Sequence, residues 1–352
     1  MASIPLLAPN DRTYKPGSIA AGRQLVMNMV PDSAVFIEIG GDDKILSNGH
    51  PASQWRTELR HIPNLRNAIS IASIYVQTVG IIWTALALRN PITYVIAFLL
   101  MGRAHAQLLA LMHESVHRLL FRKRKLNDFA GRWLLGYMSF VNTDGYRYVH
   151  MAHHREEFGP NEPDIPLYAN YPITRASFWR KMRRDGLGST GFRMLRGQFV
   201  SVFNKKLPDQ NVQQNTQRKI FALHTVLLIL SVIFVNPWVY AMLWLLPYIT
   251  VWRVMNRLRS IAEHGGLRAD SDRRVTTHSV KQHLFSSFYF VPFNLGWHIA
   301  HHTDSGIPFR SLPKYHRQLR ASGFVTDAYE YGSYLAIWRA LRSRPKSLTN
   351  AK

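Results

Sequence analysis

Two pairs of long apolar segments constrain the fold of this chain more than any other feature of its sequence. The first pair covers residues 67–88 and 92–112, and residues 67–88 include no charged side chain. An α-helix needs about 20 apolar residues to cross the hydrocarbon core of a bilayer. Only Arg-Asn-Pro separates the two segments, so we predict a transmembrane helical hairpin.

The second pair covers residues 220–235 and 238–252, joined by Asn-Pro. Both segments are short for a bilayer, but they can span it if flanking side chains snorkel or the membrane thins. A further apolar run, 133–141, is too short to span, which favours a surface or re-entrant helix. The sequence therefore predicts an all-α integral membrane protein with four transmembrane helices in two hairpins.

The distribution of positive charge predicts the orientation of these hairpins. The chain has a net charge of +23, and the turns at 89–91 and 236–237 hold only one charge between them. Four other segments are rich in Arg and Lys: 53–66, 118–132, 147–155 and 253–274. By the positive-inside rule, we expect both termini and the large loops on the cytosolic side. The charge excess thus has a membrane explanation, and we expect no nucleic-acid partner, because the chain shows no nucleic-acid-binding motif.

Histidines are the candidate metal ligands, because the chain has 16 of them and no cysteine. The lack of cysteine excludes disulfides, thiol catalysis, iron–sulfur clusters and cysteine-ligated zinc within this chain. Eight histidines fall in three clusters with helical spacing, which places the imidazoles of each cluster on one helix face. The clusters are His113 and His117, then His150, His153 and His154, then His298, His301 and His302.

Each cluster lies at the predicted cytosolic end of a span or in a cytosolic loop, so the three can converge beneath the membrane. Eight imidazoles are too many for one ion and suit two. We therefore predict a cytosolic helical cap that carries a di-metal histidine site. His264, in Arg-Ser-Ile-Ala-Glu-His-Gly-Gly, is a ninth candidate, although this sequence is also typical of a helix C-cap.

His113-Glu114-x-x-His117 also matches the zinc-protease motif, in which the glutamate is the general base. Such a protease needs one further ligand and has no use for two His-x-x-His-His clusters. Glu114 is then either an acceptor that orients a liganding imidazole or a solvated helix residue. Within the second span, Arg103 and His105 must face protein or water, and we expect a structural hydrogen bond for His105.

The three clusters, their order and the two-hairpin layout resemble the membrane fatty acid desaturase superfamily from about Asn67 to His316. Further similarities are the Glu-Pro-Asp-Ile sequence at Glu162–Ile165, the Asn before the third cluster and the Pro…Leu-Pro run after it. The resemblance implies two ferrous ions with O2 as co-substrate. Spacing alone does not select iron, because imidazole also suits zinc and copper. The implied ligands are His113, His117, His150, His153, His154, His264, His298, His301 and His302.

The resemblance implies an oxygen-dependent lipid desaturase, an oxidoreductase that introduces a double bond into an acyl or similar hydrocarbon chain. A hydroxylase or ketolase of a lipid or carotenoid on the same scaffold is an alternative. An intramembrane zinc metalloprotease and a non-catalytic metal-binding membrane protein are alternatives from other classes. No His-Pro-Gly-Gly haem-binding sequence is present, so electrons are expected from an external donor of ferredoxin or cytochrome type with its reductase.

The expected organisation has three parts. Residues 1–66 form a cytosolic N-terminal extension, residues 67–316 the membrane desaturase domain, and residues 317–352 a cytosolic C-terminal segment.

Overall fold

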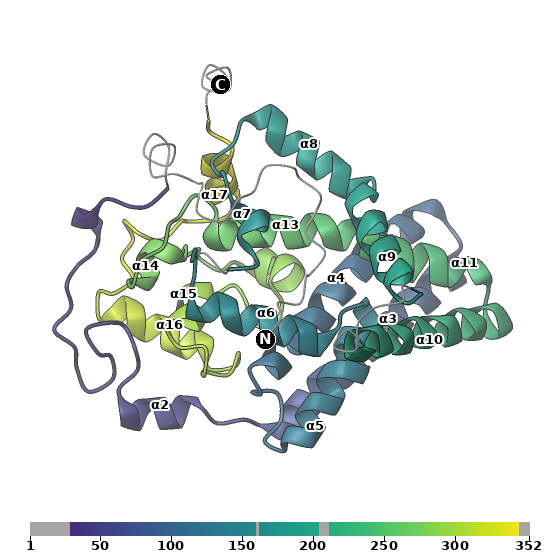
Figure 1. Ribbon diagram of the computed structural model, residues 1–352, viewed down its shortest axis with the longest axis horizontal. Helices are drawn as coiled ribbons and strands as arrows, with labels where there is room; N and C mark the ends of the chain where they lie inside the picture. The colour runs from purple at the N-terminus through teal and green to yellow at the C-terminus, as the bar shows by residue number, and fades with distance from the viewer. Residues whose placement is uncertain (1–28, 160–161, 204–210, 345–352) are drawn as a thin grey trace.

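The computed structural model describes residues 29–159, 162–203 and 211–344 (Figure 1). Within these residues there is no strand, only two isolated β-bridges, Ile45 with Pro51 and Val280 with Tyr331. The predicted all-α class is therefore confirmed. The shorter helices are α2 (Ser53–Leu59), α5 (Arg124–Phe129), α6 (Thr143–Arg155), α7 (Ile165–Tyr168), α8 (Arg175–Gly186), α9 (Ser189–Ser201), α14 (Arg273–Thr276), α15 (His298–Thr303), α16 (Leu312–Ala321) and α17 (Tyr334–Leu341).

Four helices are long and apolar enough to cross a membrane, as predicted. They are α3 (Asn64–Leu88), α4 (Pro91–Val116), α10 (Asn211–Phe234) and a continuous helical stretch, Pro237–His264, built from α11 (Pro237–Tyr240), η5 (Ala241–Leu245), α12 (Leu246–Ile249) and α13 (Val251–His264). In Figure 1, α3, α10 and α11 lie on one side of the molecule, α14–α16 lie on the other, and α13 runs through the middle.

Each hairpin turn is fixed by an Asn-Pro pair. The Asn90 side chain accepts a hydrogen bond from Thr93 N at 3.0 Å, and Pro91 takes the first helical position. Asn236 caps the next helix in the same way, accepting from Trp238 N at 2.9 Å before Pro237. Asn is a favoured N-cap and Pro is favoured at N1, so these two short sequences end one span and start the next.

The second hairpin is longer than the apolar runs 220–235 and 238–252 indicated. Helix α10 begins at Asn211, and the last span continues to His264. The added turns are polar and basic. Those of α13 can remain helical because they pack against α7, α8 and α17 rather than against lipid. This extension carries the fourth span to the level of the histidine clusters.

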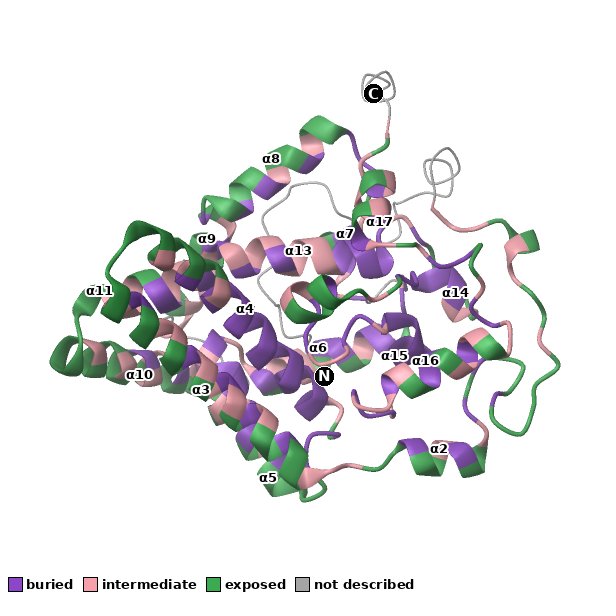
Figure 2. Ribbon diagram, turned by 180° about the vertical axis from the view of Figure 1, so that it is seen from behind, coloured by how far each residue is buried: buried purple, intermediate pink, exposed green. Residues whose placement is uncertain are grey.

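Helix α4 divides into an exposed half and a buried half. Ile92, Val95 and Ile96 are 72%, 59% and 50% exposed, whereas every residue from Met101 to Val116 is buried. Figure 2 shows that α4 is largely buried, whereas α10 and α11 have exposed faces. The buried half ends at the first histidine cluster, so α4 forms the central support of the site.

The apolar run 133–141 does not span, as predicted. It forms a π-helix, η2 (Ala130–Gly136), and a 3₁₀ turn, η3 (Tyr137–Ser139). Irregular backbone at membrane depth is tolerated only where its polar groups are paired inside the protein. Three spans supply donors to its carbonyls: Tyr75 Oη to Leu134 at 2.5 Å, His224 Nε2 to Tyr137 at 2.9 Å and Trp244 Nε1 to Met138 at 3.1 Å.

Arg103 and His105 face protein, as predicted. Arg103 donates to Gln77 Oε1 at 2.9 Å and to Gln107 Oε1 at 3.0 Å. His105 is 0% exposed, and its Nε2 donates to the Trp244 carbonyl at 3.0 Å while its Nδ1 accepts from the Ser139 hydroxyl at 2.9 Å. His105 therefore has the predicted structural role, tying α4 to η3 and to the fourth span.

The described part of the predicted N-terminal extension packs on the helices that surround the histidines, and residues 1–28 lie outside the described residues. Met29 N donates to the Gly266 carbonyl at 2.8 Å, and the Tyr315 hydroxyl donates to the Gly49 carbonyl at 2.7 Å. The division at residues 66 and 316 remains a prediction.

Candidate metal centre

All nine predicted histidines lie together, at the ends of four helices. Helix α4 ends at the first cluster, α6 carries the second, α13 ends at His264, and α15 carries the third. His117 is partly exposed and the other eight are buried. Asn142 sets the start of α6 by accepting from Gly145 N at 3.1 Å, which fixes the face that its histidines present.

The first group contains five histidines, each of which offers one ring nitrogen, and these five nitrogens lie within 4.8 Å of one another. They are His113, His117, His150, His154 and His301. Nε2 of His150 is 2.9 Å from Nε2 of His117 and 3.0 Å from Nε2 of His154, which is itself 3.0 Å from Nε2 of His301. Neighbouring ligands at about 2.1 Å from one ion lie roughly 3 Å apart. The spacing therefore suits a shared ion.

The second group contains His153, His264 and His302, again with ring nitrogens within 4.8 Å. His298 does not lie within 4.8 Å of all three of these residues. Its Nε2 is, however, 3.0 Å from Nε2 of His264. The two groups adjoin, because the rings of His154 and His302 stack at 4.3 Å. The nine histidines thus fall into a set of five and a neighbouring set of four.

Three of the four rings of the second group are oriented by acceptors on their outer side. Nδ1 of His302 contacts Glu157, and Nδ1 of His153 contacts Glu162. His264 Nδ1 donates to the Thr276 carbonyl at 2.9 Å. His298 Nδ1 lies 3.5 Å from Glu263 Oε1 without forming a hydrogen bond to it. A proton held on Nδ1 leaves Nε2 with its lone pair directed to the centre of the group, as metal-binding histidines require.

Two partly exposed arginines neutralise two of these carboxylates. Arg273 Nη1 lies 2.7 Å from Glu157 Oε1, and Arg259 Nε lies 2.9 Å from Glu263 Oε1. Sequence reasoning missed these outer residues. Glu162 lies in the Glu-Pro-Asp-Ile sequence, which indicated a similarity to the family but not the role of this residue. The signal that could have identified Glu157 is its helical spacing from His154.

Both groups have buried ring nitrogens without hydrogen-bond partners among the described residues, and in the second group these are Nδ1 of His298 and Nε2 of His302. Among the described residues, neither ring nitrogen of His113 has a hydrogen-bond partner, and neither does Nδ1 of His301. Buried polar atoms are nearly always paired, because leaving one unpaired costs about 1–3 kcal/mol. A metal ion bound by one ring nitrogen of His113 would satisfy that orphaned atom, and the all-imidazole donor set suits such an ion.

Burial sets the protonation of the histidines outside the spans. It lowers the pKa of His117 to about 3, and it holds the pKa of His150 and His301 well below the usual value, helped by neighbouring imidazoles. Burial also acts to lower the pKa of His153, but the hydrogen bond and the charge of Glu162 outweigh it and leave that pKa raised. Neutral imidazoles are the form that binds metal.

Glu114 has neither of the two roles considered for it, which were an acceptor for a liganding imidazole and a solvated helix residue. It is 1% exposed, so it is not a solvated residue, and among the described residues its Oε1 has no hydrogen-bond partner. Its Oε2 accepts from Phe309 N at 3.2 Å, which ties α4 to the segment that follows the third cluster. Glu114 is therefore a structural acceptor for backbone rather than for an imidazole.

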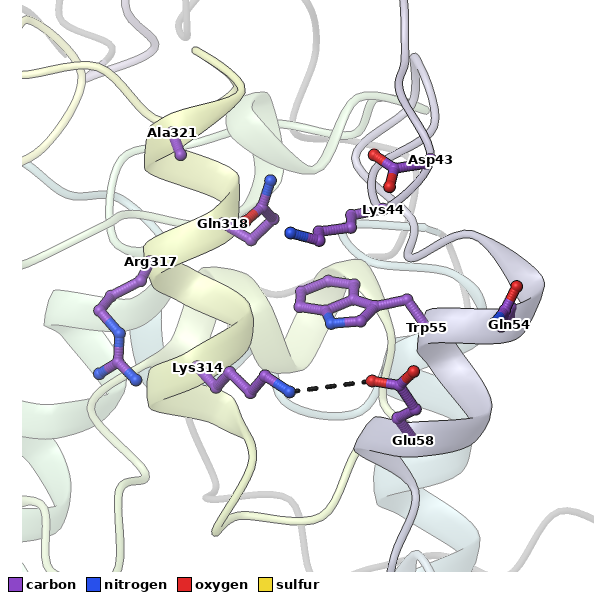
Figure 3. Close-up of a pocket in the computed structure, with 9 residues that line it drawn as sticks. All are labelled: Asp43, Lys44, Gln54, Trp55, Glu58, Lys314, Arg317, Gln318 and Ala321. Carbon is purple, nitrogen blue, oxygen red and sulfur yellow. Dashed lines mark ion pairs between the residues drawn. The ribbon is translucent and has the colours of Figure 1, made fainter.

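Two cavities lie away from the histidines. One of about 530 Å³ opens between α2 and α16, where Lys314 Nζ lies 4.0 Å from Glu58 Oε2 beside Trp55 (Figure 3). Another of about 510 Å³ follows the outer face of α3. Its lining is Tyr75, Val76, Val79, Gly80 and Trp83.

Comparisons with known proteins agree with this arrangement. The sequence model of a family described as fatty acid desaturase matches residues 50–335, a range that includes all nine histidines. A curated protein, dihydrorhizobitoxine desaturase of Bradyrhizobium elkanii, is 22% identical over 333 residues, which cover 88% of this chain and 92% of that protein.

Proposed function

The chain belongs to the fatty acid desaturase family, and from this premise we propose that it is a membrane-bound, oxygen-dependent di-iron lipid desaturase. The family and the four apolar helices establish a desaturase-type membrane oxidoreductase with a histidine cluster able to bind metal. The proposal adds the metal, the oxidant and the substrate class: an acyl or similar hydrocarbon chain receives a double bond.

The single observation that carries the proposal is the division of nine histidines into two adjoining groups. The group of five would hold one ion, and His153, His264, His298 and His302 would hold the other. Bound ferrous iron supplies the activation of dioxygen, which no side chain of this protein can perform. Glu157 and Glu162 hold the Nδ1 protons of His302 and His153, and so keep both rings in the ligating tautomer.

The reaction removes two hydrogens from adjacent carbons of the substrate. One O2, two electrons, two protons and these two hydrogens yield two molecules of water and an alkene. The electrons come from an external ferredoxin or cytochrome with its reductase. The relative's name assigns it dihydrorhizobitoxine as substrate, and at 22% identity that substrate is not transferred to this chain.

Lipid analysis of a host that expresses the protein tests this function. We expect a product two hydrogens lighter than a host lipid, and none from His153→Ala; a gain of one oxygen would instead identify a hydroxylase. The purified protein should contain two iron ions per chain. One zinc per chain, with proteolysis that persists without oxygen, would contradict the proposal and support the metalloprotease alternative.

A further inference from the structure

We propose that residues 284–290 form an additional membrane-embedded element, which enters the hydrocarbon beside α4 without crossing the bilayer. Its occupant would be lipid acyl chains, contacted by Leu284, Phe285 and Phe288. This segment lies between the fourth span and the third histidine cluster, and its seven residues are too few to span. The inference concerns the membrane surface of the protein and does not depend on the proposed reaction.

The segment presents large apolar side chains outward. Leu284 is 93% exposed, Phe285 is 66% exposed and Phe288 is 52% exposed. The Leu284 side chain is therefore almost free of protein contact. Burying apolar surface is favourable by about 25 cal/mol per Å². Contiguous exposed apolar side chains of this size therefore mark a contact surface, and lipid is the apolar phase that a membrane protein meets.

Three contacts attach the segment to the second span. Arg103 Nε donates to the Phe288 carbonyl at 2.6 Å, and its guanidinium lies 3.9 Å from the centre of the Phe288 ring. The Tyr289 hydroxyl donates to the Leu99 carbonyl at 3.1 Å. Both partners belong to the middle of α4, not to its end near the histidines.

The position of these partners along α4 gives the depth. Leu99 and Arg103 follow Pro91 by eight and twelve residues, which at 1.5 Å per residue is about 12 Å and about 18 Å along the helix. The hydrocarbon core is about 30 Å thick. If the core begins near the hairpin turn at Pro91, both residues lie inside it, and so does any segment that touches them.

The backbone of the segment is suited to such an environment. It forms a π-helix, η6 (Ser286–Phe290), and the Ser286 hydroxyl accepts from His283 N at 3.0 Å and donates to the His283 carbonyl at 2.9 Å. Arg103 pairs the Phe288 carbonyl. Non-helical backbone is tolerated at membrane depth when protein groups pair it in this way.

Site-specific fluorescence tests the depth, because the chain has no cysteine and each introduced thiol is unique. Leu284→Cys is labelled with the environment-sensitive dye NBD and reconstituted in phosphatidylcholine vesicles. Quenching is measured with mid-chain spin-labelled phosphatidylcholine, headgroup spin-labelled phosphatidylcholine and aqueous iodide. Val79→Cys, on the 65% exposed face of α3, is the lipid control, and the exposed Arg317→Cys on α16 is the aqueous control.

We expect mid-chain quenching at position 284 within twofold of that at 79, and an iodide quenching constant at least fivefold below that at 317. Iodide quenching equal to that at 317, or stronger quenching by headgroup than by mid-chain label, would overturn the proposal. Arg103→Gln should raise iodide quenching at 284, whereas Arg268→Gln, at an exposed position, should not. If Arg103→Gln does not fold, the three labelled positions still decide the depth.

Discussion

At the scale of single residues, the acceptors behind the histidines matter as much as the histidines. Glu157 contacts Nδ1 of His302 and pairs with Arg273 at 2.7 Å. We expect Glu157→Gln to lower iron affinity by about 10–100-fold, because a neutral amide holds the ring's proton less firmly. Metal analysis of the purified protein after dialysis against a chelator measures this. Glu156→Gln, at the exposed neighbouring position, is the matched control and should retain its iron.

The role of Glu114 distinguishes the desaturase proposal from the protease alternative. In the first it accepts a backbone hydrogen bond, and in the second it is the general base. Its Oε2 accepts from Phe309 N at 3.2 Å, so Glu114→Ala leaves a buried N–H unpaired. We expect a loss of about 1–3 kcal/mol in stability, seen as a lower thermal unfolding temperature, with the iron content per folded chain unchanged. Loss of a hydrolytic activity while stability stays constant would assign Glu114 the role of a general base instead.

Residue-level prediction from sequence succeeded where the signal was local and failed where it was distant. The faces of His150, His153 and His154 follow from their spacing on one helix, so they could be predicted. Thr276 binds His264 Nδ1 through its backbone carbonyl, which leaves no signature in the side-chain sequence. Glu114 was misjudged because only the tertiary fold brings Phe309 N to it.

At the scale of elements, the segment 130–141 depends on close packing against α4 and α6. A Cβ at Gly136 would lie 2.2 Å from Thr143 Oγ1 and 3.1 Å from Met112 Sδ. Overpacking of this kind costs about 1–3 kcal/mol, so we expect Gly136→Ala to lower the unfolding temperature by several degrees. Gly80→Ala in α3 is the control: its Cβ meets nothing within 4 Å, and Ala favours the helix. Equal unfolding temperatures for the two variants would contradict this packing.

Some helical elements can be predicted from the sequence and others cannot. Spans are recognisable because crossing a bilayer requires a long apolar run, a property of the local sequence. Residues 284–290 gave no such signal, because a short element enters the membrane only when Arg103 and Leu99 hold it there. The polar turns added to α13 were missed for the same reason, since packing against α7, α8 and α17 rather than hydrophobicity keeps them helical.

At the scale of the whole molecule, the two hairpin turns and the histidines lie at opposite ends of the four spans. Asn90 and Asn236 mark one end, and His113 and His264 mark the other. The basic residues gather at the histidine end, and this supports the proposal that both termini and the metal centre are cytosolic. The orientation is a separate question from the chemistry, because the site would have the same geometry in either direction.

Accessibility of single cysteines on the two faces of the membrane tests this orientation. Lys125→Cys places a thiol at an exposed position of α5, near the histidine end, and Arg89→Cys places one in the first hairpin turn. With a membrane-impermeant maleimide, we expect position 125 to react in inside-out vesicles and position 89 in right-side-out vesicles, each at least tenfold faster than in the opposite preparation. The reverse pattern would place the histidines outside the cytosol, where cytosolic ferredoxin or cytochrome could not reach them, and an external donor on that side would then be required.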